Sequence, residues 1–347
     1  MELQNPTCGL EEYAAANGPV GEIIERPDEA FLPIELESLC AGTEKRFRLC
    51  LRTEPGKYVL YLSEEHPFGE SHRLNLLKHG TEHLYVPAED RTSYLNYLEA
   101  NLDNILRRES LAVEKKARII QTSVTRALEE VFEQPRAEFI QRSKNLIRST
   151  VDAVLSDQAT TQSLLSLTIH DHYTYNHSVN VGIYGLAFSR ELFGVAPQHN
   201  LYELAAGFFL HDLGKCRIDP NILNKPGKLS EEEWKEVRMH PIWSHEILES
   251  TGHLTREARI IALQHHERQD GSGYPHRLRG HEIHLYAKIC CIADVFDALT
   301  SDRPYRKRSS TFEALDVMKM EMESEFDPNF FGRFVLLFAE EVSSVPA

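Results

Sequence analysis

Several histidine and aspartate side chains interrupt or end apolar helical stretches in the second half of the chain. One histidine breaks the run YNHSVNVGIYGLAF, and a histidine–aspartate pair follows AAGFFL. An ionised aspartate or an unpaired imidazole in such a setting is costly unless another group compensates it. A divalent metal ion would compensate several of these groups at once. The candidate ligands are His177, His211, Asp212, His240, His265, His266 and Asp294.

These residue types also indicate which metals and which reaction to expect. Five histidines and two aspartates can hold two six-coordinate ions if one aspartate bridges them. Mixed imidazole and carboxylate ligands suit iron, manganese, zinc or nickel better than magnesium or calcium. Two ions roughly 3.5 to 4 Å apart would polarise a phosphoryl group and deprotonate a water. The whole set therefore predicts hydrolysis of a phosphate ester, although one histidine–aspartate pair alone would be weak support.

Four motifs in this half of the chain resemble those of a known family. They are HDLGK at 211–215, HP followed by IL at 240–248, HHERQDGSGYP at 265–275 and ADVFDALTSDRPYRK at 293–307. In these motifs, residues from about 165 to 335 resemble an HD-GYP domain. This is the branch of the HD metal-dependent phosphohydrolases associated with breakdown of the second messenger cyclic di-GMP. The GYP loop distinguishes this branch from other HD enzymes.

The resemblance implies a division of the candidate ligands between two ions, with Asp212 as the bridge. Iron is the expected metal, with manganese, nickel or zinc as alternatives. One ion would be surrounded by His177, His211, Asp212 and Asp294, and the other by Asp212, His240, His265 and His266.

The resemblance also implies residues that contact the substrate. Lys215, one turn after the bridging aspartate, would hold a phosphate oxygen and stabilise developing charge. Tyr274 lies in the loop that would edge the pocket. The guanine and the phosphates would be contacted by Asp297, Arg303 and Arg306.

Three positions depart from the family pattern or remain open. Some relatives hold a third metal with a glutamate at the position of Tyr173, so two metals are expected here. Ser244 stands where relatives often have glycine, and it is expected to leave His240 unaffected. Glu267 is either a group that orients a ligand imidazole or a surface acid.

The leading hypothesis is a phosphodiesterase that hydrolyses cyclic di-GMP to pGpG, GMP or both through a dinuclear metal site. No general acid for the leaving group is evident from the sequence. Two alternatives stay open: a sensor that binds cyclic dinucleotides without hydrolysis, and a hydrolase of another cyclic dinucleotide such as cyclic GMP-AMP.

The elements that must position these residues are expected to be helices. From about Ser156 onward, helical stretches are separated by short polar loops, and no alternating strand pattern is present. This predicts an all-α HD-GYP domain over 156–347 in a mainly α protein. The adjacent histidines at 265 and 266 are expected at a helix end, where neighbouring side chains can point toward one ion.

The first 90 residues predict a small α+β domain. Between about Ile34 and Val86, the alternating segments RFRLCLRT and KYVLYLS flank EPG and read as a hairpin. A short helix near SHRLNLLKHG should end at Gly80, followed by an edge-like strand HLYVP. The domain is a structural or protein-interaction module, or a ligand sensor that passes its signal to a partner. It lacks the acidic cluster and lysine of a phosphorylation receiver.

Residues 91–155 predict a helical linker. Apolar residues at Ile120, Val124, Ala127 and Val131 follow 4-3-4 steps, which suit a helix packed against a partner helix. That partner is either a second subunit, giving a homodimer, or the other arm of an intramolecular hairpin. Pro135 limits any single helix.

Composition restricts the partners and the compartment. With 38 lysines and arginines against 53 aspartates and glutamates, the chain carries a formal charge of −15, which disfavours nucleic acid and anionic membranes. No signal peptide or stretch of about 20 apolar residues is evident. The six cysteines lack CxxC spacing, and Cys290 and Cys291 lie in an apolar run. A cytoplasmic protein with reduced thiols is expected.

Overall fold

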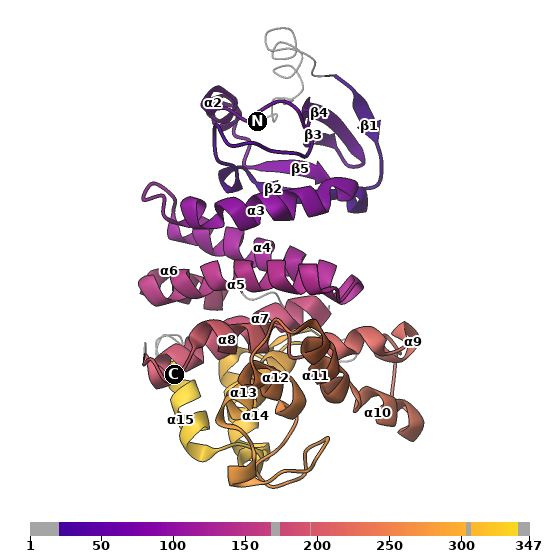
Figure 1. Cartoon of the computed structure of the whole chain (residues 1–347), viewed down its shortest axis with the longest axis vertical. Coiled ribbons are helices and arrows are strands. Elements are labelled where there is room, and N and C mark those ends of the chain that lie inside the picture. Colours follow the sequence, from indigo (N-terminus) through magenta and orange to yellow (C-terminus); the bar gives the residue numbers. More distant parts are fainter. Residues whose placement is uncertain (1–20, 168–173, 195, 303–306, 339–347) are drawn as a thin grey trace. The chain divides into compact units, whose positions relative to one another are not determined.

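The computed structural model describes residues 21–167, 174–194, 196–302 and 307–338. The chain divides into two compact units, Met1–Ser123 and Val124–Ala347. Figure 1 shows that the sheet is confined to the first unit and that the second is built of helices. The prediction of a mainly α protein with a small α+β region is confirmed.

The sheet of the N-terminal unit has five strands in the order β1-β4-β3-β5-β2. The predicted hairpin is confirmed, because β3 and β4 pair antiparallel and Glu54 lies opposite Lys57 across a two-residue turn. The predicted helix is also present, as α2. The elements are β1 (Ile23–Glu25), β2 (Phe31–Glu35), β3 (Leu49–Glu54), β4 (Lys57–Leu62), α2 (Glu70–Lys78) and β5 (His83–Pro87).

The expectation that HLYVP forms an edge strand is wrong. This segment is β5, which pairs with β2 on one side and with β3 on the other. Its Leu84 and Val86 are fully buried. The edges are β1 and β2, and β2 carries an exposed proline at Pro33. Proline cannot donate a ladder hydrogen bond and is therefore typical of an edge strand.

Helix α3 (Arg91–Leu106) completes the N-terminal core. The ring of Phe47 meets those of Tyr94 and Tyr97 edge-on, with centroids 5.4 Å apart in both pairs. Leu98 and Leu102 are fully buried on the same helix. Short 3₁₀ turns lie at Asp28–Ala30, Leu36–Ser38 and Ala88–Asp90.

Helices α4 (Val113–Glu133) and α5 (Ala137–Ser156) follow, with Pro135 between them. The boundary between the two units falls inside α4. The apolar side chains in 4-3-4 steps are no more than 1% exposed in the single chain. These side chains are therefore buried within the single chain, and the choice between a second subunit and an intramolecular hairpin stays a prediction.

Helices alone make up the described part of the C-terminal unit, so the all-α prediction for this region is confirmed. After α5 come α6 (Gln158–Ser166), α7 (Thr174–Phe193), α8 (Leu201–Phe209), η4 (Leu213–Arg217), α9 (Pro220–Leu223), α10 (Glu231–Val237), α11 (His240–Thr251), α12 (Arg256–Gln264), η5 (Gly280–Glu282), α13 (Leu285–Thr300), α14 (Thr311–Glu321), η6 (Glu323–Glu325) and α15 (Pro328–Leu336).

Close packing of α7 on α8 brings the first candidate ligands together. A Cβ atom at Gly182 would overlap the ring of Phe209, so only glycine allows this approach. The two phenylalanines at the end of α8 are fully buried. The chain leaves α8 directly into His211 and Asp212, which therefore come to lie beside His177 of α7.

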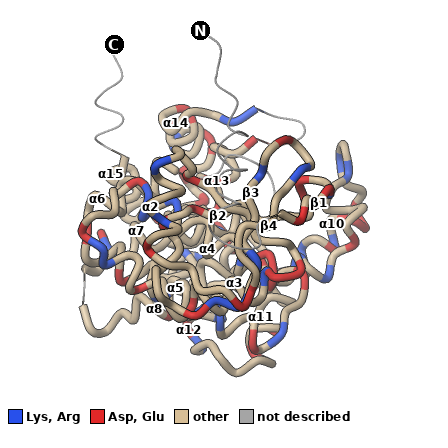
Figure 2. Tube along the Cα trace, turned by 90° about the horizontal axis from the view of Figure 1, so that it is seen from above, with Lys and Arg blue, Asp and Glu red and all other residues tan. Residues whose placement is uncertain are grey.

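Charged residues are interspersed along the described chain, as Figure 2 shows for the view from above. Among the described residues, no helix combines the length and apolar character that a membrane span requires. The described cysteines are unpaired, and Cys290 and Cys291 are buried as predicted.

Candidate metal centre

The seven predicted metal ligands converge from five parts of the C-terminal unit. They come from α7, the turn after α8, the start of α11, the end of α12 and the middle of α13. His265 is the C-cap of α12, so the two adjacent histidines lie at a helix end as expected. Two groups have potential ligand atoms within 4.8 Å of one another: Asp212 with His240, His265 and His266, and Asp212 with His177 and His211.

Asp212 is shared by both groups. Its Oδ1 lies 3.1 Å from Nε2 of His240 and 3.6 Å from Nε2 of His265. Its Oδ2 lies 3.4 Å from Nε2 of His177 and 3.5 Å from Nε2 of His211. Each oxygen therefore faces one group, which is the arrangement that a bridging carboxylate needs.

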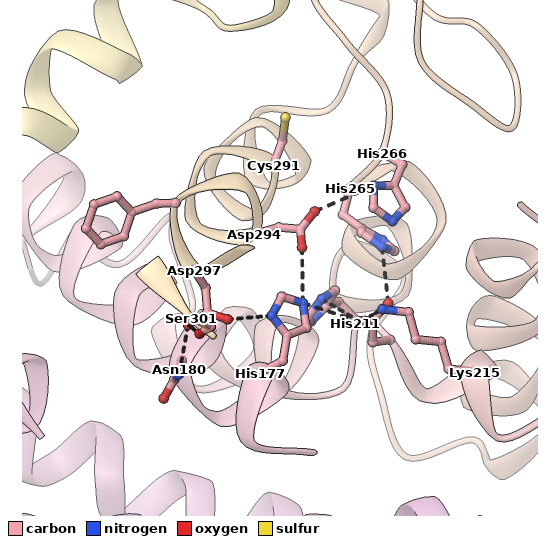
Figure 3. A network of polar contacts seen from close by, with 12 residues as sticks. His177, Asn180, His211, Lys215, His265, His266, Cys291, Asp294, Asp297 and Ser301 are labelled. Atoms are coloured by element: carbon pink, nitrogen blue, oxygen red, sulfur yellow. Dashed lines mark hydrogen bonds and ion pairs between the residues drawn. The ribbon is translucent and has the colours of Figure 1, made fainter. Parts of the chain in front are cut away.

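Asp294 lies between two imidazoles. Its Oδ1 is 3.1 Å from Nε2 of His177, and its Oδ2 is 3.5 Å from Nδ1 of His266. Figure 3 shows this carboxylate pointing toward both rings. The sequence assigned Asp294 to the first group, but the geometry lets it reach a member of each.

Backbone carbonyls determine the tautomer of three histidines. Nδ1 lies 2.8 Å from Phe208 O in His211, 2.6 Å from Val237 O in His240 and 2.8 Å from Ala262 O in His265. A carbonyl oxygen only accepts, so Nδ1 must carry the hydrogen and donate it. In the neutral imidazole, Nε2 then keeps its lone pair, which is the form that binds metals.

These lone pairs meet other acceptors within the cluster. The Nε2 atoms of His240 and His265 are only 3.3 Å apart. Among the described residues, Nε2 of His211 and Oδ1 of Asp212 are buried without any hydrogen-bond partner. Buried acceptors that face one another are unfavourable unless a cation lies among them. The residues therefore fit divalent metal ions.

The pKa shifts favour the protonation states that metal binding requires. Burial lowers the pKa of His211 to about 3, and it also lowers the pKa of His240 and of His266. Burial acts to raise the pKa of Asp212, but opposing effects, the charge of Lys215 above all, hold that pKa well below its usual value. Neutral imidazoles thus surround an ionised carboxylate.

His177 differs from these histidines because it lies between carboxylates. Burial acts to lower its pKa, but hydrogen bonds with Asp294 and Asp297 outweigh burial and raise it to about 9. Its Nδ1 lies 2.7 Å from Oδ2 of Asp297. Asp297 therefore orients the ring and leaves Nε2 facing the cluster (Figure 3).

The environment of Asp297 differs from that expected of a substrate contact. Its side chain is 1% exposed, and its Oδ1 accepts hydrogen bonds from Nδ2 of Asn180 at 2.7 Å and from the hydroxyl of Ser301 at 3.2 Å. Both oxygens are therefore engaged behind His177. Asn180 was missed in the sequence, although a polar residue one helical turn after a candidate ligand was a usable signal.

Lys215 lies beside the shared carboxylate, as expected, but on the 3₁₀ helix η4 rather than on an α-helix. Residues three apart eclipse each other in this geometry, and the Lys215 ammonium forms an ion pair with Oδ2 of Asp212. Ser244 holds the same turn, because its hydroxyl accepts a hydrogen bond of 2.7 Å from the amide of Gly214. The serine therefore fastens the HDLGK turn to α11.

The GYP loop packs directly on a candidate ligand. The ring of Tyr274 stacks on that of His266 with centroids 4.6 Å apart, and its amide donates to His266 O at 3.2 Å. A Cβ atom at Gly273 would overlap that same carbonyl, so glycine is needed for the approach. Tyr274 is thus placed beside the metal cluster, where it supports His266.

Glu267 fits neither of the roles left open by the sequence. It is 1% exposed, so it is not a surface acid. Its Oε1 accepts from the amide of His276 at 2.7 Å, and its Oε2 accepts from the amide of Leu278 at 2.9 Å. This carboxylate therefore orients no imidazole. It holds the far side of the GYP loop against the helix end that carries the histidines.

Three residues named from the sequence, Tyr173, Arg303 and Arg306, lie outside the described residues.

Comparisons with known proteins match the same half of the chain. Residues 194–330 match the family model described as an HD domain. A cyclic di-GMP phosphodiesterase of Pseudomonas aeruginosa is 38% identical over 193 residues, which cover 56% of this chain and 46% of that protein. A 3′3′-cGAMP-specific phosphodiesterase of Vibrio cholerae is 35% identical over 177 residues, which cover 50% of this chain and 38% of that protein. The chain thus spans less than half the length of these curated relatives.

A solved structure extends the likeness to most of the chain. It is Bd1817, a HDG"Y"P protein from Bdellovibrio bacteriovorus, with a TM-score of 0.64 and 22% identity, covering 89% of this chain and 99% of that one. At this identity, the likeness shows a shared fold. The family match, the relatives and the motifs show that the chain carries an HD domain of the HD-GYP type.

Proposed function

We propose that this protein is a metal-dependent phosphodiesterase that hydrolyses cyclic di-GMP to pGpG, GMP or both. One observation carries the proposal: imidazole lone pairs and two carboxylates converge in a buried cluster, and each oxygen of Asp212 faces a different group of histidines. The Pseudomonas aeruginosa relative is a cyclic di-GMP phosphodiesterase, which supports the choice of substrate.

We propose two divalent ions, iron first and manganese, nickel or zinc as alternatives. When bound, they would supply Lewis acidity to the phosphate and lower the pKa of a water. One set of ligands would be His177, His211, Asp212 and Asp294, and the other Asp212, His240, His265 and His266.

The protein's own side chains would position the reaction. Asp297 holds the His177 ring, Tyr274 stacks on His266, and Glu267 holds the GYP loop that carries Tyr274. The Lys215 ammonium lies at Asp212 and is only partly exposed. Once other cations neutralise that carboxylate, Lys215 is free to bind a phosphate oxygen and to stabilise the charge that develops there. Arg303 and Arg306 would neutralise the phosphates, a role proposed from the motif alone.

The test is turnover by the full chain. Protein reconstituted under reducing conditions with iron or manganese, and separately with nickel or zinc, is incubated with cyclic di-GMP, and the products are separated by chromatography. We expect pGpG or GMP, and about two metal ions per chain in the same sample. No turnover with any of the four metals would remove the proposal. Tight binding of the nucleotide without turnover would instead support the sensor.

A second substrate is supported by the similarity to the 3′3′-cGAMP-specific phosphodiesterase. Its identity to this chain, 35%, is close to the 38% of the cyclic di-GMP phosphodiesterase, so overall likeness does not choose between the two nucleotides. A competition assay with equal amounts of cyclic di-GMP and cyclic GMP-AMP decides by the ratio of their kcat/KM values. A ratio above about ten, or 1.4 kcal/mol, in favour of cyclic GMP-AMP would reassign the substrate.

A further inference from the structure

A row of side chains leads from the metal cluster to the surface. It begins with the stacked pair His266 and Tyr274. The guanidinium carbon of Arg238 lies 5.8 Å from the ring centre of Tyr274 and 5.7 Å from that of Trp234. Each step is a direct contact between a ring and its neighbour. Arg238, the C-cap of α10, therefore lies two contacts from a candidate metal ligand, and Trp234 of the same helix lies three contacts from it.

Both residues have a face available to a ligand. Trp234 is 44% exposed, on a helix that buries none of its own residues. Single exposed apolar residues are common, so the exposure alone would mean little. This indole, however, lies against a cation in the row that leads to the metal cluster.

The charge of Arg238 is also available. Nearby cations are paired with acids: Arg217 with Glu246 at 2.7 Å, and Lys225 with Glu233 at 2.7 Å. Arg238 forms no ion pair with any residue that the structure describes, and its contacts there are with the two aromatic rings. In a protein of net charge −15, an unpaired arginine beside the cluster attracts an anion locally.

We propose that Trp234 and Arg238 form an outer subsite for a purine nucleotide. The indole stacks on a base of the bound cyclic dinucleotide, and the guanidinium pairs with the phosphate that is not being cleaved. This inference rests on the proposed function, because it assumes that a cyclic dinucleotide lies at the metal cluster. Stacking of a base on an aromatic side chain contributes about 1–3 kcal/mol, and the planar guanidinium binds phosphate through two parallel hydrogen bonds.

The experiment compares two diesters on the metal-loaded full chain. Cyclic di-GMP carries two purines, whereas bis(p-nitrophenyl) phosphate carries none. For Trp234→Ala, we expect KM for cyclic di-GMP to rise by about tenfold, which lies within the stacking range, with kcat changed less than about twofold. Hydrolysis of bis(p-nitrophenyl) phosphate should stay within about twofold of wild type. Trp234→Phe should keep most of the affinity, and Arg238→Gln should raise KM for cyclic di-GMP only.

Controls separate this subsite from folding and from the proposed function. Met320 of α14 is 74% exposed, and Met320→Ala should change neither substrate's kinetics. An unchanged KM for cyclic di-GMP in Trp234→Ala, or an equal loss with both diesters, would overturn the subsite. If the wild type hydrolyses neither diester, the proposed function fails. The subsite is then tested by calorimetric titration of the metal-loaded protein with cyclic di-GMP, which measures Kd. A roughly tenfold weaker Kd in Trp234→Ala then supports the subsite, whereas an equal Kd, or no binding by the wild type, overturns it.

Discussion

Two clusters, one in each unit, hold ionisable groups in opposite ways. In the N-terminal unit, Lys45 is 3% exposed, and its ammonium donates to Phe47 O at 2.8 Å and to Ser63 O at 2.6 Å. Arg48 likewise donates to both oxygens of Asp90, at 2.8 and 3.0 Å. Every one of these contacts joins a donor to an acceptor.

In the candidate metal cluster of the C-terminal unit, acceptors meet acceptors. Nε2 atoms of histidines face one another and the oxygens of Asp212, while their Nδ1 hydrogens point to backbone carbonyls. A buried cluster of the first kind is complete without a ligand, whereas one of the second kind needs a cation. The direction of the hydrogen bonds therefore distinguishes a structural cluster from a binding site when burial alone does not.

The strongest test of this contrast replaces the shared carboxylate. Asp212→Asn removes the charge that faces both groups of histidines, so we expect both metal ions to be lost and phosphodiesterase activity to fall by roughly a thousandfold or more. This exceeds the effect of about 10- to 100-fold that is usual for groups that only support a ligand. Metal content and turnover are measured on one sample. Asp219→Asn, at an exposed helix cap, is the matched control and should keep both. Retention of two metals by Asp212→Asn would contradict the bridging role.

The next test concerns the carboxylate behind His177. Asp297→Asn keeps the size of the side chain but removes the charge that fixes the ring, so we expect metal affinity to fall by about 10- to 100-fold. The pKa of His177, raised to about 9 by Asp294 and Asp297 against the effect of burial, should fall in the metal-free variant and can be followed by NMR. If Asp297 contacted substrate instead, KM would rise with metal affinity unchanged. Asp152→Asn, at an exposed site, is the control.

A smaller effect is expected at the clamp on the GYP loop. In Glu267→Gln, the side-chain NH₂ group faces the amide of either His276 or Leu278, so a partly buried donor loses its acceptor. We expect the free energy of unfolding to fall by about 2 kcal/mol, measured by urea denaturation. Glu282→Gln, which removes a charge from an exposed acid in the same loop, should stay within about 0.5 kcal/mol of wild type. Equal stability of the two variants would show that the clamp contributes little.

The smallest effect is expected at Lys45 of the N-terminal unit, whose ammonium already donates to two backbone carbonyls. Burial lowers the pKa of Lys45 to about 8, whereas the unfolded chain keeps its proton up to a pH of about 10.4. Below pH 8 both states are protonated and the cost of burying the charge is present in full. Above pH 8 the folded state releases its proton first, so stability rises with pH, by about 1 kcal/mol between pH 8 and 9.

This rise should be absent in Lys45→Met. Urea unfolding of the full chain is followed through the methyl signals of Leu49 and Leu60, which report on the sheet of the N-terminal unit. Because other groups also titrate, the relevant quantity is the difference between wild type and variant at each pH. An identical pH dependence of the two proteins would show that Lys45 is not buried as a charge.

Much of the fold could be predicted because its signals are local. The hairpin of β3 and β4, helix α2 and the all-helical C-terminal unit follow from alternation, helical spacing and turn residues. The central position of β5 in the sheet could not be predicted, because strand order depends on pairing with strands that are distant in the sequence. Its neighbour β2 lies about fifty residues earlier and includes Pro33, which weakens the strand pattern.

The sequence by itself determined which types of ligand the candidate site contains, because short motifs specify these residues and their order along the chain. Only the tertiary structure decided the roles of the supporting residues. Asp297 lies 120 residues from the histidine that it orients, and Glu267 is engaged by amides across the loop rather than by a neighbouring ring. Periodicity states which face of an element a side chain occupies, but a hydrogen bond requires two elements to meet at about 3 Å, and only packing sets that distance.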